Sequence, residues 1–323
     1  MKFSALLLST AIITSSLVAA PALAQDYPTK PVHVITTTSA GGLSDIFMRG
    51  LGDELSKRWG QPLIIENRPG GSQNIGTRAC TEAPPDGYTI CIINADAVIY
   101  NQFLFKSLPF DPEKGLQPIT NLFHLIHMLV VNSDLKVKNV DELVALSKAK
   151  PGKLNYLTPG APMALYMETL KKEKGADWVR VPFRGGGEAV NAILSGSTPI
   201  ALFGEGNVIG QIRGGKMTPL LMMNNIKSPN FPDVPLLSST GYKGAPSRGW
   251  YGLFAPAGTP KAIVDKINKD VATVVGDAAF RDRHLSARSL VSAINTPEQF
   301  AAEIKHDRAV AQTVVKDSGL EPQ

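Results

Sequence analysis

The sequence lacks the residue combinations on which most catalytic and nucleic-acid-binding sites depend. Its 323 residues include only two cysteines and five histidines, and no histidine lies near a cysteine in sequence. A zinc or redox centre built from these residue types is therefore not predicted. The formal net charge is +5, it is scattered along the chain, and no basic run alternates with aromatic residues. This excludes a nucleic-acid footprint, whereas a mild positive balance suits small anionic ligands.

Motifs of nucleotide binding and nucleophilic catalysis are also missing. There is no P-loop, residues 70–74 (GGSQN) lack the closing glycine of a nucleophile elbow, and residues 204–210 (GEGNVIG) miss the dinucleotide-binding spacing by one residue. His124 and His127 lie in an apolar, strand-like run, where they would share a metal only if the run were helical. We therefore expect neither an enzyme, nor a cofactor, nor a bound metal.

The N-terminal residues have the composition of an export signal. Lys2 precedes an uncharged apolar run over residues 3–20, and residues 22–24 (ALA) form a small-x-small cleavage site. We expect residues 1–24 to be a signal peptide, a mature chain from Gln25, and a periplasmic location. A membrane anchor is the alternative, and it is disfavoured by the serines and threonines of the run and by the cleavage pattern.

The two cysteines, Cys80 and Cys91, are expected to form a disulfide because exported chains fold in an oxidising compartment. A loop this short would contribute roughly 2–3 kcal/mol through the unfolded state. A redox or metal pair is the alternative, but it lacks partner residues.

The rest of the chain alternates short apolar strands with amphipathic helices, which predicts α/β domains with mostly parallel sheets flanked by helices. A helix is expected from Leu43 to a stop at Gly60. Two long apolar segments, 122–132 and 250–255, are interpreted as crossings between two domains. The predicted domains are 25–130 plus 248–323, and 131–247. Strands are expected at 32–36, 63–66, 89–93, 154–157, 179–183, 199–203 and 218–222, and further helices at 140–149, 163–174 and 188–194.

Glycine- and hydroxyl-rich loops follow several of the predicted strands, where α/β domains bind ligands. In the first loop, glycines let the backbone approach a ligand, and the next helix directs its free N–H groups into the loop, as anion sites require. A plain turn with Ser44 or Asp45 capping the helix is the alternative. The candidate binding residues of this loop are Ser39, Ala40, Gly41, Gly42, Leu43, Ser44 and Asp45. Later loops add Asn94 and Asp96, Thr158 and Gly160, and Arg184.

A series of short motifs in one order resembles a known family, the periplasmic substrate-binding proteins of tripartite tricarboxylate transporters, also called Bug receptors. The resemblance covers essentially the whole mature sequence. The motifs are 27–32 (YPTKPV), 41–45 (GGLSD), 66–70 (ENRPG), 83–89 (APPDGYT), 150–156 (KPGKLNY), 182–185 (PFRG), 231–235 (FPDVP), 252–260 (GLFAPAGTP) and 296–300 (TPEQF).

This resemblance implies a type II-like periplasmic binding protein, in which two α/β domains close on a ligand lying in the cleft between them. It implies that backbone amides of the Ser39–Asp45 loop hold one ligand carboxylate. The far end of the ligand would meet residues 158–163, including Met163, and the strand end at 203–205, including Glu205. The expected partners are a small carboxylate and the membrane subunits of a tripartite tricarboxylate transporter, and the receptor is expected to be a monomer.

The sequence departs from the family pattern at three places, and two of them concern the far end of the ligand. Residues 38–40 replace prolines, Pro162 and Met163 replace a glycine and a hydroxyl, and Gly204 and Glu205 replace Asp-Asn. If Glu205 lines the cleft, the ligand should present an apolar or hydrogen-bond-donating end, as an aromatic or amino-bearing carboxylate would. If it points to solvent, a di- or tricarboxylate stays open. The remaining alternatives are a sensory protein that presents the carboxylate to a membrane kinase, and a secreted hydrolase or lyase on the same scaffold.

Overall fold

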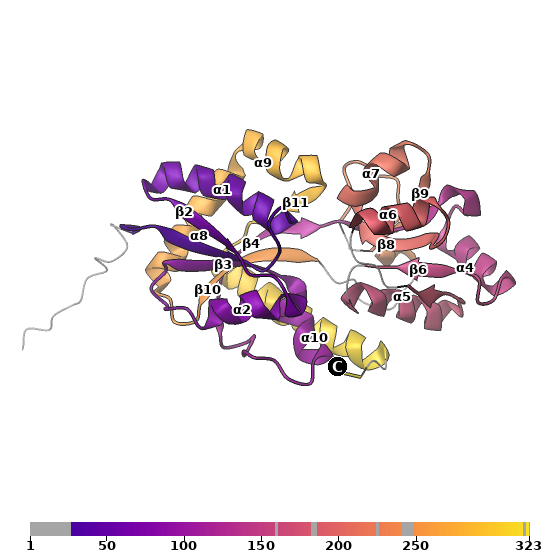
Figure 1. Cartoon of the computed structure of the whole chain (residues 1–323), viewed down its shortest axis with the longest axis horizontal. Coiled ribbons are helices and arrows are strands. Elements are labelled where there is room, and N and C mark those ends of the chain that lie inside the picture. Colours follow the sequence, from indigo (N-terminus) through magenta and orange to yellow (C-terminus); the bar gives the residue numbers. More distant parts are fainter. Residues whose placement is uncertain are drawn as a thin grey trace, which may run out of the picture.

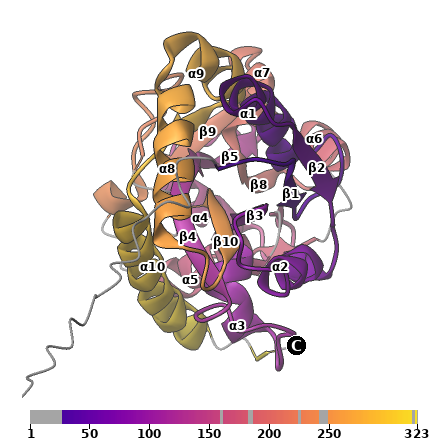
Figure 2. The same ribbon diagram turned by 90° about the vertical axis from the view of Figure 1, so that its left-hand side faces the viewer.

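The chain folds into two lobes that lie side by side along the long axis of the molecule (Figure 1). The computed structural model describes residues 27–158, 161–181, 186–223, 226–240, 249–318 and 321–322. Each lobe is built on one β-sheet with helices packed against it (Figures 1 and 2). The predicted α/β fold class with two lobes is therefore confirmed.

The sheet of the first lobe has the strand order β11-β4-β10-β3-β1-β2. Strand β1 is parallel to both β2 and β3, whereas β10 is antiparallel to β3 and β4, and β11 is antiparallel to β4. The strands are β1 (Val32–Thr36), β2 (Leu63–Asn67), β3 (Thr89–Asn94), β4 (Leu116–Leu125), β10 (Trp250–Pro256) and β11 (Leu290–Ser292).

The sheet of the second lobe has the order β7-β6-β8-β5-β9. Strand β6 is parallel to β7 and β8, and β5 is antiparallel to β8 and β9. The strands are β5 (His127–Asn132), β6 (Asn155–Leu157), β7 (Val179–Arg180), β8 (Ile200–Gly204) and β9 (Met217–Met222).

Both sheets are mixed, so the expectation of mostly parallel sheets is wrong in this detail. Only β1, β2 and β3 in one sheet, and β6, β7 and β8 in the other, form parallel sets. A strand that arrives from the other lobe begins at the junction between the lobes, where the parallel strands end. It must therefore run against them, as β10 and β5 do.

The four predicted helices, one in the first lobe and three in the second, correspond to α1, α4, α5 and α6. The helix after β1 begins at Leu43 and stops at Gly60, which has a left-handed φ of 64° and donates its N–H to Ser56 O. The helices are α1 (Leu43–Trp59), α2 (Asn74–Thr81), α3 (Asn101–Leu104), α4 (Val140–Ala149), α5 (Ala161–Lys174), α6 (Gly186–Leu194), α7 (Glu205–Arg213), α8 (Lys261–Gly276), α9 (Ala278–His284) and α10 (Pro297–Ser318).

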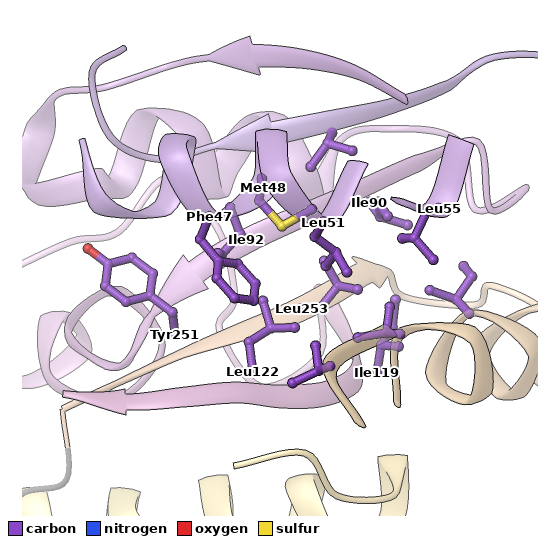
Figure 3. Close-up of a cluster of buried hydrophobic side chains, with 14 of the residues drawn as sticks. Phe47, Met48, Leu51, Leu55, Ile90, Ile92, Ile119, Leu122, Tyr251 and Leu253 are labelled. Carbon is purple, nitrogen blue, oxygen red and sulfur yellow. The ribbon is translucent and has the colours of Figure 1, made fainter. Parts of the chain in front are cut away.

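The core of the first lobe lies between α1 and the sheet. Apolar residues of α1 recur at helical spacing, so one face of the helix packs against strands β3, β4 and β10 (Figure 3). Burying each such side chain contributes about 1.5–3 kcal/mol. The labelled residues are Phe47, Met48, Leu51, Leu55, Ile90, Ile92, Ile119, Leu122, Tyr251 and Leu253.

The predicted disulfide between Cys80 and Cys91 is present. It joins the last turn of α2 to strand β3, and both residues are fully buried. The bond therefore fixes a helix of the first lobe to the strand beside β1.

The chain crosses between the lobes at Ile126, because β4 ends at Leu125 and β5 begins at His127. We propose Ile126, rather than residue 130, as the first domain boundary. The second predicted boundary, at residue 248, lies outside the described residues. Among the helices of the described residues, none is long and apolar enough for a membrane span.

Candidate functional site

The direction of the strands brings the predicted loops to the junction between the lobes. Strand β10 enters from the second lobe and is antiparallel to β3, so β1 and β3 end at the junction. Strand β5 enters from the first lobe and is antiparallel to β8, which is parallel to β6, so β6 and β8 also end there. The C-terminal ends of β1, β3, β6 and β8 therefore lie at the junction, and strand ends of this kind are where α/β domains bind ligands.

The first of these loops, residues 37–45, is organised around the carboxylate of Asp45, which is 2% exposed. Its Oδ2 accepts the backbone N–H of Gly41 at 2.9 Å and Arg49 Nε at 3.1 Å. Its Oδ1 accepts Arg49 Nη2 at 2.8 Å and Asn67 Nδ2 at 3.0 Å. Burial alone would raise the pKa of Asp45, but these hydrogen bonds and the charge of Arg49 hold it below its ordinary value.

Further hydrogen bonds within the loop fix its shape. The hydroxyls of Thr38 and Ser44 lie 2.6 Å apart, and the N–H of Gly42 donates to Ser39 O at 2.9 Å. Asn67 also donates to Thr36 Oγ1 and Thr38 O. The loop thus keeps its conformation through its own contacts and those of strand β2.

The sequence alternative of a side-chain cap on α1 is wrong. The N-cap residue is Gly42, and no side chain caps it. The Ser44 hydroxyl bonds Thr38 instead, and the Asp45 carboxylate turns back to Gly41.

Several backbone N–H groups of the loop make no hydrogen bond within the described part of the chain. The first bond of α1 runs from Ile46 N to Gly42 O, so the N–H groups of residues 43–45 have no intrahelical partner. Ser44 and Asp45 are buried, whereas Ser39 and Ala40, whose N–H groups are also unused, are exposed. The amides of Gly41 and Gly42 donate within the loop, so the accessible N–H groups are those of Ser39 and Ala40.

The loop after β3 places two predicted residues differently. Asn94 Oδ1 accepts the N–H of Ala97 at 3.2 Å and so supports the π-helical turn Asp96–Tyr100. Asp96 is half-buried, and none of the hydrogen bonds within the described residues involves its carboxylate. Burial raises the pKa of Asp96 to about 6. The phenol of Tyr251 has a pKa above its ordinary value, first because of burial and then because of the charge of Asp96.

The candidate residues after β6 contribute little open polar surface. Thr158 is 3% exposed, and Met163 is 6% exposed and belongs to the core of the second lobe. Gly160 and Arg184 lie outside the described residues. Met163 packs inward because α5 directs this face against Tyr156 and Trp178.

Glu205 neither points to solvent nor presents an open carboxylate to the junction, since it is 0% exposed. Its Oε1 accepts Asn230 Nδ2 at 2.8 Å, and the same amide lies 3.5 Å from Ser289 Oγ of the first lobe. Its Oε2 is buried and has no hydrogen-bond partner among the described residues. The solvent-exposed alternative is therefore wrong, because α7 begins against Ile126 O and buries its first side chain.

His124 and His127 lie on different strands, β4 and β5. His124 Nε2 is 3.8 Å from Glu303 Oε1, whereas His127 is 6% exposed, and burial lowers its pKa to about 4. Across the described ranges, no group of three or more metal-ligating side chains gathers. A cavity of about 640 Å³ lies between α1, α8 and α9, away from these loops.

Sequence reasoning missed Arg49 and Asn67, which hold the first loop in place. Arg49 follows Asp45 by four residues, a spacing that predicts an ion pair on a helix. Asn67 belongs to the ENRPG motif, whose contact with the loop depends on the pairing of β1 with β2.

Two lobes joined by crossing strands, with the predicted binding loops at the junction, define the architecture of a bilobal solute-binding protein, and the comparisons agree. Residues 47–320 match the family model described as tripartite tricarboxylate transporter family receptor. The chain therefore belongs to this receptor family, and the resemblance seen in the motifs is confirmed.

Curated relatives extend over nearly the whole chain. A UPF0065 protein from Cupriavidus necator is 30% identical over 309 residues, which cover 94% of this chain and 93% of the relative. The protein BugT from Bordetella pertussis is 28% identical over 310 residues, which cover 95% of each chain.

Solved structures show the same fold. A periplasmic transporter protein is 32% identical with a TM-score of 0.79, covering 91% of this chain and 99% of its own. The periplasmic binding protein BugD is 27% identical with a TM-score of 0.77, covering 92% and 100%. MatC from Rhodopseudomonas palustris, with bound malate, is 26% identical with a TM-score of 0.75, covering 90% and 100%.

Proposed function

We propose that this chain captures a small carboxylate between its two lobes and delivers it to the membrane subunits of a tripartite tricarboxylate transporter. It would act in the periplasm as a monomer, after removal of residues 1–24, and without catalysing a reaction. The observation that carries the proposal is the loop fixed by Asp45, in which the exposed residues Ser39 and Ala40 have backbone N–H groups that no hydrogen bond within the described residues uses.

The electrostatics of this loop favour an anion in spite of Asp45. The negative charge of Asp45 is offset by Arg49, whose Nη2 lies 2.8 Å from the carboxylate. Asp45 is 2% exposed, so its carboxylate faces its own hydrogen-bond partners and not the junction. The open N–H groups at the start of α1 carry the positive end of the helix dipole. One charge-assisted cradle and a closed cleft can supply the roughly −8 kcal/mol of micromolar binding.

The bound malate of MatC supports a carboxylate ligand, because MatC shares the fold of this chain and is 26% identical to it. Ligand binding would favour the closed arrangement of the lobes, which the membrane subunits then recognise. Only this differential affinity for the closed form can transmit the presence of ligand.

The two glycines at the ends of α1 provide the test. Gly41 and Gly60 have left-handed φ angles of 77° and 64°, and at each an added methyl group meets nothing within 4 Å. Alanine at either position costs about 1 kcal/mol of backbone strain, but only Gly41 lies beside the open N–H groups. Gly42 is unsuitable, because its methyl group would lie 2.8 Å from Ser39 O.

We expect Gly41→Ala to weaken carboxylate binding by about tenfold, because the added methyl group would hinder the approach of a carboxylate to the neighbouring amides by as much as the loss of one charge-assisted hydrogen bond, whereas Gly60→Ala leaves binding unchanged. Ligands are first found by thermal shift against a carboxylate panel, since a ligand at 100 times its Kd adds about 2.7 kcal/mol. Equal affinities of the two variants by calorimetry would reject the loop as the carboxylate site.

The remaining parts of the proposal have separate readouts. The mass of the protein recovered from the periplasm should correspond to a chain starting at Gln25. Incubation with a bound carboxylate should leave that carboxylate chemically unchanged. A strain without the gene should lose uptake of the ligand, whereas a sensory role would alter gene expression and leave uptake intact.

A further inference from the structure

Asp96 is a carboxylate placed next to the loop that would bind the ligand's own carboxylate. It begins the turn after β3, and β3 is the direct neighbour of β1, with Thr36 opposite Ile92. The hydroxyl of Thr37, just beyond β1, lies 3.4 Å from Ile92 O. Adjacent strands are about 4.8 Å apart, so the turn at Asp96 and the loop 37–45 lie side by side at the junction.

On its other side, Asp96 borders the start of β10. Tyr251 is opposite Asn94 in the pairing of β10 with β3, and its phenol responds to the charge of Asp96. Figure 3 shows Tyr251 at the end of the first-lobe core, with its hydroxyl directed away from the apolar side chains. Asp96 thus lies between the carboxylate loop and a buried tyrosine.

No cation in the described part of the chain neutralises Asp96. The helix packed against its turn is α10, and the charged residues of α10 nearest the first-lobe strands are engaged elsewhere. Glu303 accepts Asn121 Nδ2, Asp307 accepts Trp250 Nε1, and Arg308 binds Val98 O and Glu113. The carboxylate of Asp96 is also accessible from outside. Its oxygens make no hydrogen bond among the described residues, yet they are not among the fully buried polar atoms that lack a partner.

The charge of Asp96 has a consequence for the ligand. With a pKa raised to about 6 by burial, its carboxyl is mostly ionised at neutral pH. An ionised carboxylate beside the anion loop repels a second negative charge and attracts a positive one. Two like charges in one half-buried site would require protonation of one of them.

We propose that Asp96 determines ligand specificity by binding a positively charged nitrogen, so that the preferred ligand is a carboxylate that also carries a protonated amine. This inference rests on the proposed function and names the class of ligand. The ligand carboxylate would take the open N–H groups around residues 39–45, and its ammonium would donate to Asp96. The separation of neighbouring strand ends suits a small amino carboxylate.

The test uses the full mature protein and pairs of probes that differ only by the amine. These are succinate with aspartate, glutarate with glutamate, and 3-phenylpropionate with phenylalanine. Wild type should bind the amino member of at least one pair about ten- to a hundredfold more tightly, the effect of one hydrogen bond between charged groups.

The variant Asp96→Asn keeps the shape of the side chain and removes its charge. It should lose most of this preference and bind the amine-free member at least as tightly as wild type does. The control Asp53→Asn removes the same charge from an exposed position of α1 and should keep the wild-type preference.

A second measurement needs no variant. Affinity for the amino carboxylate should fall as the pH drops from 7.5 to 5, because Asp96 gains a proton and loses its attraction for the ammonium. Tyr251 stays neutral over this range, since its pKa is raised. If Asp96 instead donated a proton to a ligand carboxylate, affinity would increase on acidification.

The proposal is overturned if the amine-free members bind wild type more tightly, if no amino carboxylate binds, or if Asp96→Asn keeps the wild-type preference. Failure of the proposed function looks different, because then no carboxylate would bind, with or without an amine.

Discussion

The two faces of the junction differ in how their polar groups are used. On the first lobe, Asp45 fixes a loop with unused backbone donors, and Asp96 has no hydrogen-bond partner among the described residues. On the second lobe, the described candidate residues Met163 and Glu205 are buried among their own neighbours. Among the described candidate residues, the polar groups accessible to a ligand therefore lie on the first lobe, whereas Met163 and Glu205 contribute packing and a buried hydrogen bond. We expect substitutions at the first face to change binding, and those at Glu205 to change only stability.

The largest expected effect comes from the centre of the first face. Asp45→Ala removes the acceptor of Gly41, Arg49 and Asn67 and leaves these donors without their buried partner. We expect a loss of about 3 kcal/mol in the free energy of unfolding, measured by urea denaturation, together with loss of carboxylate binding. Asp53→Ala, at an exposed position of the same helix, should change neither. Retained binding in Asp45→Ala would show that the loop does not depend on this carboxylate.

The next effect concerns the frame behind the first face. Replacing Cys80 and Cys91 together by alanine removes a bond that closes a loop of sequence separation 11. The expected loss is about 2–3 kcal/mol in unfolding free energy, with the ligand preference unchanged at a temperature where the variant is folded. Mass spectrometry without reduction should find no free thiol in the wild-type protein. A change in preference would assign the disulfide a role beyond stability.

A pH titration compares one group from each face. Burial lowers the pKa of His127 to about 4. Between pH 6.5 and 4 the unfolded state therefore binds more protons than the native state, and the free energy of unfolding decreases as the pH falls. Burial raises the pKa of Asp96 to about 6, so the native state binds more protons below pH 6, and Asp96 adds stability as the pH falls.

His127 and Asp96 change the free energy of unfolding in opposite directions as the pH falls, so a variant that lacks one of them shows the effect of the other. We expect the stability of Asp96→Asn to fall more steeply than that of wild type between pH 6.5 and 4, by about 1–2 kcal/mol over this range. His127→Leu should fall less steeply than wild type. Denaturant titrations at several pH values measure both slopes, and parallel curves for all three proteins would contradict the assignment.

The smallest effect is expected on the second face. Glu205→Gln keeps the shape of the side chain and an oxygen for Asn230, so the unfolding free energy should change by less than about 1 kcal/mol. Affinity and amine preference should equal those of wild type in calorimetry. If this variant alters the preference as strongly as Asp96→Asn, then the second lobe also selects the ligand by charge.

The sequence allowed elements with local signals to be predicted in both lobes. The helix from Leu43 to Gly60 follows from apolar spacing and a terminal glycine, and the disulfide follows from two cysteines in a chain expected to be exported. The predicted helices at 140–149, 163–174 and 188–194 likewise correspond to α4, α5 and α6. The apolar segments 122–132 and 250–255 were interpreted as crossings between the lobes, but the directions of β10 and β5 were missed. An apolar run does not record on which side of the junction its neighbouring strands begin, and this decides whether the strands run parallel.

The site residues divide in the same way. The loop 39–45 was predicted as a binding site because glycines after a strand have a local meaning. The burial of Glu205 was not predicted, because it depends on Asn230 and Ser289, which only the folded chain brings near it. Asp96 was predicted as a candidate, but that it has no hydrogen-bond partner among the described residues can be recognised only from the folded chain.

The connection at Ile126 has a mechanical consequence. Its carbonyl accepts Glu205 N–H and its side chain is 2% exposed, so Ile126 moves with the second lobe. The preceding residue, Leu125, belongs to β4 and donates its N–H at 2.7 Å to Gly249 O on the other crossing segment. Rotation of one lobe against the other must therefore be taken up by the backbone torsions between Leu125 and Ile126, beside a second segment held to the first by a hydrogen bond. Because the two crossing segments are joined by a hydrogen bond, the lobes can rotate about the axis through both segments, whereas rotation about other axes is resisted.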